Sequence, residues 1–511
     1  MSQDAALPSK TKRLLLTMTV MAAALMQVLD TTIANVALPH MQSALGATQE
    51  SIAWVLTSYI VCAAIATPVT GWLEARIGRR MLFTVAIAGF TISSALCGIA
   101  LSLGMMVLAR ALQGLCGAFI SPLSQAVLLD IYPPEKRAEA LMIWGMGIMI
   151  GPILGPVLGG WLTDSFNWRW VFYINLPFGV IATIGVLALM DERILPRRKF
   201  DMTGFAMLGL ALAAFQIMLD RGTQQDWYHS TEILIEGAVT IGAFWMFVVH
   251  TLTGKSPLIP RALFRDRNFL ISNIFLFVVM GTSMAGGALL APLIQNLLGY
   301  DSMQAGVAMA PRGLGMLISM LAGGRLNGRV DNRVMIGFGL LLTALSLEMQ
   351  TRFDFDIGWH ELFWSGLIQG LGAGLVILPL NILAFATLSP TLRTDGTAFY
   401  SLSRNIGSSI GISIASAMLA RNLQISHADL TTHVTDAVLP LLNPAVVQGM
   451  APTGMLSTMA DMEINRQALM ISYLDDFYLM MWPTLLSIPM VLFMRGAAKA
   501  SSAEDRSLVM E

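Results

Sequence analysis

The chain has 511 residues, of which 55% are hydrophobic and only 12% are charged, and its mean hydropathy is +0.67. A soluble protein carries roughly twice this share of charged residues, so the composition predicts an integral membrane protein. The formal net charge of −1 gives no sign of a nucleic-acid partner. Cys62, Cys97 and Cys116 lie in apolar stretches without metal-ligand spacing, and we predict no metal site, no disulfide framework and no cofactor.

Fourteen segments are apolar over about the 20 residues that a membrane-crossing helix needs. The first follows Lys10, Lys12 and Arg13, as in a signal peptide, but it is too long for one and contains Asp30. We therefore interpret it as an uncleaved span. The predicted spans are 14–38, 51–73, 81–102, 105–129, 139–163, 170–190, 203–220, 232–253, 270–298, 304–325, 334–350, 361–387, 396–420 and 476–495.

Lysine and arginine are divided unequally between the loops on the two sides of these spans. An even number of spans places both termini on one side, and 23 of the 31 basic residues fall on that side against five on the other. Basic residues accumulate in cytoplasmic loops, so we predict that both termini are cytoplasmic. The remaining three basic residues, Arg110, Arg312 and Arg404, lie inside spans.

The two ends of the chain repeat one another at an offset of 256 residues, so that Gln113 matches Gln369 and Gly151 matches Gly407. The matching segments have the same orientation, which predicts two parallel six-helix halves, with two unmatched spans between them. The predicted organisation is a cytoplasmic tail (1–13), an N-terminal half (14–190), two linker helices with a cytoplasmic connector (191–269), a C-terminal half (270–495) with an external loop (421–475), and a cytoplasmic tail (496–511).

Asp30 is the one carboxylate that we place well inside a span. Burial in a membrane disfavours the charged form of a carboxyl group, so Asp30 is our candidate for a site that loads and unloads a proton. A fixed structural partner of Arg110, or a helix-end cap, is the alternative role.

The segment 71–80, between the second and third spans, reads GWLEARIGRR. Its glycines permit a tight turn, and its arginines stay in water, where they pair with helix ends or acidic side chains. We predict a conformational motif here, and the alternative is a merely positive cytoplasmic turn. The residues concerned are Gly71, Arg76, Gly78, Arg79 and Arg80.

Span 4 contains Arg110, followed three residues later by Gln113. An arginine in so apolar a helix is costly unless it faces a cavity or a partner. Arg110 is therefore a candidate functional residue. The alternative is an arginine that extends to a nearby membrane surface.

Span 5 places glycine at every fourth position, so one helix face is a smooth groove against which a neighbouring helix packs closely. A proline within the motif removes a backbone donor and can bend the helix. Ordinary small-residue packing is the alternative to a transport motif. The residues of the motif are Gly147, Gly151, Gly155, Pro156, Gly159 and Gly160.

Arg312 and Arg404 complete the intramembrane charges. Each is a candidate to bind a substrate anion, to balance Asp30 or to hold helix carbonyl groups. One intramembrane carboxylate against three arginines fits neutral, amphiphilic or weakly acidic substrates better than polycations. The candidate cavity residues are Asn35, Gln113, Arg312 and Arg404.

Together these motifs resemble the major facilitator superfamily. Segment 71–80 is similar to its loop signature G-x-L-A-D-R-x-G-R-R, except that Ala75 stands in the Asp position and Glu74 one place earlier. The glycine motif of span 5 is similar to the antiporter motif of the superfamily's drug exporters. The sequence LDTTIANVALP at 29–39 resembles the first-helix motif of the fourteen-helix drug:proton antiporter family, exemplified by EmrB and QacA, and QIMLDRG at 216–222 favours the EmrB branch.

The resemblance implies an all-α major facilitator fold of fourteen transmembrane helices, with two six-helix halves and two extra central helices, in a bacterial inner membrane. It implies a proton-coupled multidrug efflux transporter, not an enzyme, that exports lipophilic or amphiphilic small molecules by alternating access. Asp30 and Arg110 would carry the proton coupling.

EmrB-like pumps work with a periplasmic adaptor and an outer-membrane channel, and segment 421–475 is either a docking surface for such partners or a disordered connector. A nutrient symporter and a membrane sensor that kept the fold are the alternative functions. The chain has no Walker A motif, so ATP-driven transport is not supported.

Overall fold

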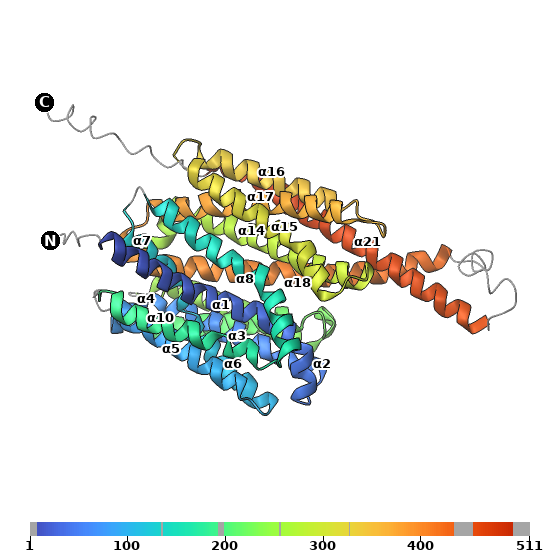
Figure 1. The fold of residues 1–511 in the computed structure, drawn as a ribbon, viewed down its shortest axis with the longest axis horizontal. Helices are drawn as coiled ribbons and strands as arrows, with labels where there is room; N and C mark the ends of the chain where they lie inside the picture. Colours follow the sequence, from blue (N-terminus) through green and yellow to red (C-terminus); the bar gives the residue numbers. More distant parts are fainter. Residues whose placement is uncertain are drawn as a thin grey trace.

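The computed structural model describes residues 8–133, 136–192, 199–254, 257–326, 328–433 and 453–493. This part of the chain is helical, with no β-strand in it, and its long helices run side by side in one bundle (Figure 1). The predicted tail 496–511 and residues 434–452 of the predicted external loop lie outside the described residues. The prediction of an all-α protein is confirmed.

Eleven stretches of helix in the described chain are long and apolar enough to cross a membrane. They are α1 (Lys10–Ala44), α3 (Trp54–Ala66) with α4 (Thr70–Ile77), α5 (Arg79–Gly98), α6 (Leu103–Gly117) with α7 (Ile120–Ile131), α9 (Trp170–Tyr173) with α10 (Asn175–Leu189), α11 (Met202–Arg221), α12 (Thr231–Thr253), α14 (Arg267–Pro292) with η4 (Leu293–Leu297), α15 (Ser302–Leu326), α16 (Asn332–Gln350) and α17 (Trp359–Ala386). Three further long helices are α8 (Arg137–Ser165), α18 (Arg393–His433) and α21 (Thr453–Met490).

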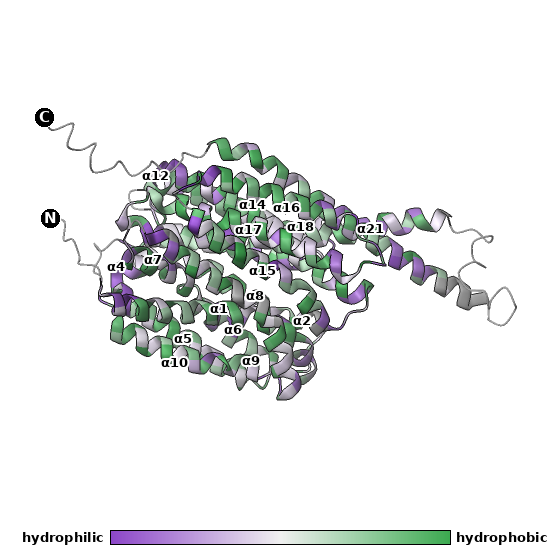
Figure 2. Cartoon of the chain, turned by 45° about the horizontal axis from the view of Figure 1, so that its top comes forward, coloured by the Kyte–Doolittle hydropathy of each residue, from purple (hydrophilic) through white to green (hydrophobic). Residues whose placement is uncertain are grey.

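The outer face of the bundle is apolar. Ile241 and Trp245 of α12 and Leu486 of α21 are all more than half exposed. Contact of these apolar side chains with water would be unfavourable, whereas contact with lipid would not. Figure 2 shows hydrophobic residues along the helices and hydrophilic residues gathered at the ends of the bundle. The chain is therefore a multi-pass membrane protein.

The start of α1 and the end of the last described helical turn, η6 (Val491–Phe493), lie at the same end of the bundle (Figure 1). At the opposite end α18 and α21 extend beyond the other helices. The segment predicted as the external loop is therefore helical where it is described, over 421–433 and 453–475.

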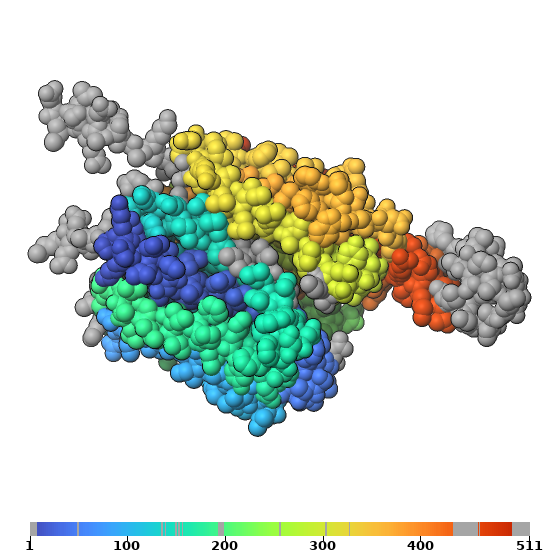
Figure 3. Space-filling view, viewed as in Figure 1, coloured from blue at the N-terminus to red at the C-terminus, as the bar shows by residue number. Residues whose placement is uncertain are grey.

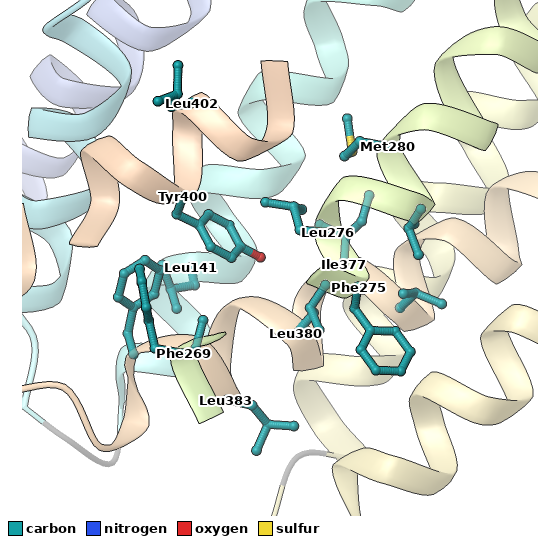
Figure 4. Packing of buried hydrophobic residues seen from close by; sticks show 14 of the residues in the cluster. Leu141, Phe269, Phe275, Leu276, Met280, Ile377, Leu380, Leu383, Tyr400 and Leu402 are labelled. Carbon is teal, nitrogen blue, oxygen red and sulfur yellow. The ribbon is translucent and has the colours of Figure 1, made fainter. Parts of the chain in front are cut away.

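The N-terminal helices, α1 to α10, pack against the C-terminal helices, α14 to α21, near the end where α1 begins. One buried cluster there combines Leu129 and Leu141, of α7 and α8, with Phe269 and Tyr400, of α14 and α18 (Figure 4). In Figure 3 the start of α8 lies directly against the C-terminal helices drawn in yellow. Towards the other end the buried clusters are separate, one within each group of helices.

Gln125 of α7 and Asn381 of α17 form a polar contact between the two groups. Both are buried, and Gln125 Nε2 donates a hydrogen bond to Asn381 Oδ1 at 3.1 Å. They are 256 residues apart, which is the offset of the sequence repeat. Two positions that correspond in the repeat thus contact one another.

The α14–α18 interface depends on close backbone contact at glycine. A Cβ atom on Gly407 would lie 2.9 Å from Phe277 Cα, too close for a side chain. We expect Gly407→Ala to destabilise the protein by about 2 kcal/mol, because the helices must separate. On Gly337 of α16 nothing lies within 4 Å of an added Cβ, so Gly337→Ala should be neutral or stabilise by up to about 1 kcal/mol. Denaturation in detergent micelles measures both, and equal effects would contradict the packing.

Candidate functional site

Asp30 lies at the centre of a buried polar cluster formed by α1, α6 and α10, which we call the Asp30 cluster: Asp30, Arg110, Gln113 and Asn175. Asp30 and Arg110 are almost wholly buried, and Arg110 Nη1 donates to Asp30 Oδ2 at 2.7 Å. Gln113 Nε2 and Asn175 Nδ2 donate to Asp30 Oδ1 at 2.8 Å and 2.7 Å. Both carboxylate oxygens are therefore bound by side-chain donors.

The guanidinium group of Arg110 is held on several sides. Its Nε donates to the backbone carbonyl of Val55 at 3.1 Å, and its Nη1 also donates to Gln113 Oε1 at 2.7 Å. The Tyr59 ring lies 4.5 Å from the guanidinium carbon, a favourable cation–π distance. Arg110 is therefore a fixed, desolvated cation and does not extend to a membrane surface.

Neighbouring residues fix the cluster in place. Asn175 Nδ2 also donates to Ser94 Oγ at 2.9 Å, and Ser94 Oγ donates to the carbonyl of Phe172 at the same distance. Gly114 lets α6 approach α3, because a Cβ there would lie 3.0 Å from Tyr59 Cα. Helices α1, α6 and α10 thus meet at one carboxylate, and α3 and α5 hold the residues that bind it.

The structure brings together some of the candidate residues and separates others. Asp30, Arg110 and Gln113 share the cluster, whereas Asn35 is exposed and donates to Thr31 O in its own helix. Asn175 was not among the sequence candidates. The signal for it was a polar side chain at the start of the apolar run that becomes α10.

Arg312 and Arg404 do not contact the Asp30 cluster. Arg312 Nη2 donates to Ser283, through its carbonyl and, at 2.8 Å, its Oγ. Arg404 Nη2 donates to Ser121 Oγ and Ser401 Oγ, both at 3.2 Å. Within the described chain neither arginine has an acidic partner, so they do not balance Asp30 directly.

The glycines of the span 5 motif form the surface of α8 that packs on α1. A Cβ at Gly147 would collide with Met21, one at Gly151 with Val28, and one at Gly155 with Thr32. Thr32 Oγ1 also donates to the carbonyl of Gly151 at 3.2 Å. Gly159 faces α1 as well, whereas an added Cβ at Gly160 would enter open space. The side chain of Pro156 lies outside the described part of the structure.

The segment 71–80 contributes to a second charged cluster, which we call the Asp130 cluster: Glu74, Arg79, Asp130, Arg393 and Thr394. Arg79 is buried, with Nε 2.6 Å from Glu74 Oε1 and Nη1 2.7 Å from Asp130 Oδ2. Arg79 Nη2 donates to Thr394 Oγ1 at 3.1 Å, and Arg393 forms an ion pair with Asp130. The cluster therefore joins α4, α5 and α7 to the start of α18.

The other residues of the segment have different surroundings. Gly78 makes the turn between α4 and α5 at φ 84°, a conformation that glycine adopts without strain. A Cβ at Gly71 would collide with the carboxylate of Asp395, so α4 lies close to α18. Arg80 donates to the carbonyl of Leu187, and Arg76 is exposed.

The Asp30–Arg110 pair gives a first test of the site. Asp30→Asn leaves a buried guanidinium without its counter-charge, which should destabilise the protein by about 3 to 5 kcal/mol. Asp30→Asn combined with Arg110→Gln should cost clearly less than the two single changes added together, because the charges are removed as a pair. Thermal unfolding of the four proteins in detergent measures this, and simple additivity would contradict the coupling.

The chain is similar to known membrane transporters over most of its length. The model of the Major Facilitator Superfamily matches residues 20–422. The "Multidrug export protein EmrB" of Escherichia coli is 34% identical over 475 residues, which cover 91% of this chain and 92% of the relative. The "Fatty acid resistance protein FarB" of Neisseria gonorrhoeae is 36% identical over 416 residues, covering 81% and 82%.

A solved structure has the same fold. The crystal structure of the human organic anion transporter MFSD10 superposes with a TM-score of 0.57 and covers 92% of this chain and 99% of the human chain. The two sequences are 16% identical, so this likeness concerns the fold alone.

Proposed function

This chain belongs to the Major Facilitator Superfamily, and we propose that it exports lipophilic or amphiphilic small molecules in exchange for protons. The observation that carries the proposal is the Asp30–Arg110 ion pair, buried among apolar helices. Ionisable residues are costly inside a membrane, and where they occur they mark transport or proton pathways. The identity with multidrug export proteins over nine-tenths of the chain supports the same function.

We infer that Asp30 carries the proton. In its ionised form Asp30 binds Arg110, Gln113 and Asn175. Protonation removes the negative charge and weakens all three bonds, which releases α1 from α6 and α10. A proton shifts a conformational equilibrium only if it binds one conformation more tightly than the other. The conformation in which the Asp30 carboxylate accepts all three hydrogen bonds disfavours the proton, so protonation favours the other conformation.

We propose that α8, α18 and α21 cross the membrane together with the eleven stretches of apolar helix, which gives fourteen spans. We further propose two related six-helix halves separated by α11 and α12. The hydrogen bond between Gln125 and Asn381 supports this arrangement, because corresponding residues of a two-fold repeat meet at its axis. The distribution of basic residues between the loops supports our proposal that both termini are cytoplasmic, and we propose a bacterial inner membrane as the location.

We propose that the Asp130 cluster is the cytoplasmic gate of an alternating-access cycle. It joins the N-terminal and C-terminal helices at the end where α1 begins, whereas buried clusters towards the opposite end stay within each group. The structure then represents a state closed to the cytoplasm. Glu74 provides the carboxylate beside Arg79, one position before the Asp of the superfamily signature.

The unpaired arginines favour substrates that carry a negative or polar group. Arg312 and Arg404 bind only neutral oxygens within the described chain, and Arg404 lies near the ring of Trp144. An amphiphile with a carboxylate and an aromatic or alkyl body matches such surroundings. The name of the Neisseria relative, a fatty acid resistance protein, is consistent with this class.

We propose that the helical extension of α18 and α21 docks a periplasmic adaptor. The two helices continue beyond the bundle (Figure 1), and His427 of one lies 3.2 Å from Asp461 of the other. Two joined helices offer a defined surface for a helical partner. An adaptor and an outer-membrane channel would complete an export path out of the cell.

Transport assays test the proton site. In proteoliposomes with an imposed pH gradient, the wild type should export a panel of dyes and antibiotics, and Asp30→Asn should reduce proton-driven efflux at least tenfold. Exposed Asp164 of α8 gives the matched control, and Asp164→Asn should export normally. Full proton-driven efflux by Asp30→Asn would refute the mechanism.

Cysteine labelling tests the gate. Arg393→Gln removes the ion pair with Asp130 and should open the cytoplasmic end, because the two groups of helices lose a buried charge contact. In a cysteine-free background carrying Ser401→Cys, a membrane-impermeant thiol reagent applied from the cytoplasmic side should react several-fold faster. Arg76→Gln, which changes an exposed arginine of the same charged region, should leave the rate unchanged. Equal rates in all three proteins would exclude Arg393 from the gate.

A further inference from the structure

A polar cavity of about 170 Å³ lies outside the Asp30 and Asp130 clusters, at the end of the bundle opposite the start of α1. Figure 1 shows α2 (Gln49–Ile52) at that end. The wall of the cavity is formed by α2, the first turn of α3, the last turn of α11 and the turn that follows it. The lining residues that carry the argument are Trp54, Thr57, Asp220, Arg221, Gln224 and Gln225.

Asp220 places an exposed carboxylate on this wall. The carboxylate accepts a hydrogen bond from Thr57 Oγ1, and it forms no ion pair with the described residues. Arg221, the basic side chain of the wall, forms an ion pair with Glu232 of α12. The described lining residues therefore carry one uncompensated negative charge.

The turn after α11 is held in place on its side of the cavity. The backbone amides of Gln224 and Gln225 donate to the carbonyl of Arg221 at 3.0 Å and 2.9 Å. The ring of Trp227 covers Gly222, where an added Cβ would lie 2.7 Å from it. The two glutamine side chains thus extend from a fixed turn, and a ligand does not have to order this turn when it binds.

The wall offers the groups that recognise a primary ammonium ion. The Asp220 carboxylate and the side-chain carbonyls of Gln224 and Gln225 are hydrogen-bond acceptors, and a primary ammonium ion carries three donors and no acceptor. The indole of Trp54, which is 37% exposed, adds an aromatic face for a cation. A quaternary ammonium group has no N–H donor and would leave these oxygens unpaired, so the polar wall favours a primary amine.

The size and the depth of the cavity limit what the amine can belong to. Drug-sized sites occupy about 300–1,000 Å³, whereas about 170 Å³ accepts an ammonium group with a short stem. The cavity lies where α3 begins and α11 ends, and tryptophan is enriched at this level of membrane proteins, at the boundary between lipid and water. The ammonium group therefore comes from a lipid head group or from a soluble amine, which share the same chemistry.

The cavity adjoins a junction between α11 and both groups of helices. Asp220 binds Thr57 of α3, and the carbonyl of the preceding Leu219 accepts a hydrogen bond from Ser413 Oγ of α18 at 3.0 Å. A ligand at Asp220 therefore lies beside the contacts that join this linker helix to the N-terminal and the C-terminal helices.

We propose that this cavity binds a primary ammonium group, with Asp220 as its counter-charge and the side chains of Gln224 and Gln225 as further acceptors. The site lies at the membrane surface and is formed by α2, α3 and α11. It shares no residue with the Asp30 cluster, so binding does not depend on proton coupling.

Saturation-transfer NMR of propylamine with the purified full-length protein in maltoside micelles tests the site. No proton gradient is present, so the result is independent of transport. Propylamine, a cation at neutral pH, should bind saturably, whereas propanol and tetramethylammonium should not. Asp220→Asn keeps an acceptor for Thr57 but removes the charge, and it should weaken binding at least tenfold. Asp226→Asn, at an exposed aspartate of the same turn outside the cavity wall, should bind like the wild type.

Competition with short-chain lipids identifies the source of the amine. Dihexanoylphosphatidylethanolamine and dihexanoylphosphatidylcholine differ only in the head group. If the ethanolamine lipid displaces propylamine at a concentration at least tenfold below that of free ethanolamine, and the choline lipid does not displace it, the site binds a lipid head group. Equal potency of the ethanolamine lipid and free ethanolamine assigns the site to a soluble amine.

A second variant separates a lost site from a lost fold. Ala53→Leu keeps every polar group of the wall but fills the cavity, so it should also weaken binding at least tenfold while its thermal unfolding stays close to that of the wild type. The proposal is wrong if the folded wild type does not bind propylamine, or if it binds propanol equally well. It is also wrong if folded Asp220→Asn binds propylamine as tightly as the wild type, or if Asp226→Asn loses binding to the same extent.

Discussion

The cost of a charge inside the membrane governs how the N-terminal helices are arranged. Asp30 and Arg110 are both removed from water, and the attraction between two buried charges offsets their desolvation only when further hydrogen bonds satisfy the remaining donors and acceptors. Gln113, Asn175 and the carbonyl of Val55 provide those bonds. Helices α1, α3, α6 and α10 must therefore meet at one depth, and the close packing of the N-terminal helices follows from that requirement.

The C-terminal helices keep part of the same arrangement without its charges. At the repeat offset of 256 residues, Asp30 corresponds to Gly286, Arg110 to Gly366 and Gln113 to Gln369. A Cβ atom on Gly286 would lie 3.3 Å from Gln369 Nε2. At the corresponding positions of the N-terminal helices, Gln113 Nε2 donates a hydrogen bond to Asp30. The C-terminal helices therefore keep a glutamine beside the position that corresponds to Asp30, although they lack the ion pair. The proposed proton site therefore belongs to the N-terminal helices, whereas Arg312 and Arg404 of the C-terminal helices bind only neutral oxygens within the described chain.

Several features were predictable from sequence because the membrane makes polar residues conspicuous. Asp30 and Arg110 stand out in apolar spans, and the glycine spacing of span 5 predicts a close helix contact wherever its partner lies. The sequence could not show which helices converge, so Asn175 and Tyr59 were missed. The last span was predicted to begin at Asp476, whereas α21 is continuous from Thr453 to Met490, because hydropathy does not separate an apolar helix from its polar extension. The polar segment 421–475 suggested a loop for the same reason, whereas its described residues are helical.

Helix α8 packs both on α1, which carries the proposed proton site, and on α15 of the C-terminal helices. One of its faces packs on α1 through Gly147, Gly151 and Gly155, within three turns of Asp30 along α1. Another face lies against α15, where an added Cβ on Gly145 would be 3.0 Å from Met320. At these glycines, side chains of α1 and α15 lie directly against the backbone of α8, so the helices approach more closely than larger residues would allow. In the proposed mechanism, a shift of α1 on protonation of Asp30 would press on α8 through these contacts, and α8 would pass the movement to α15 at the interface between the two groups of helices.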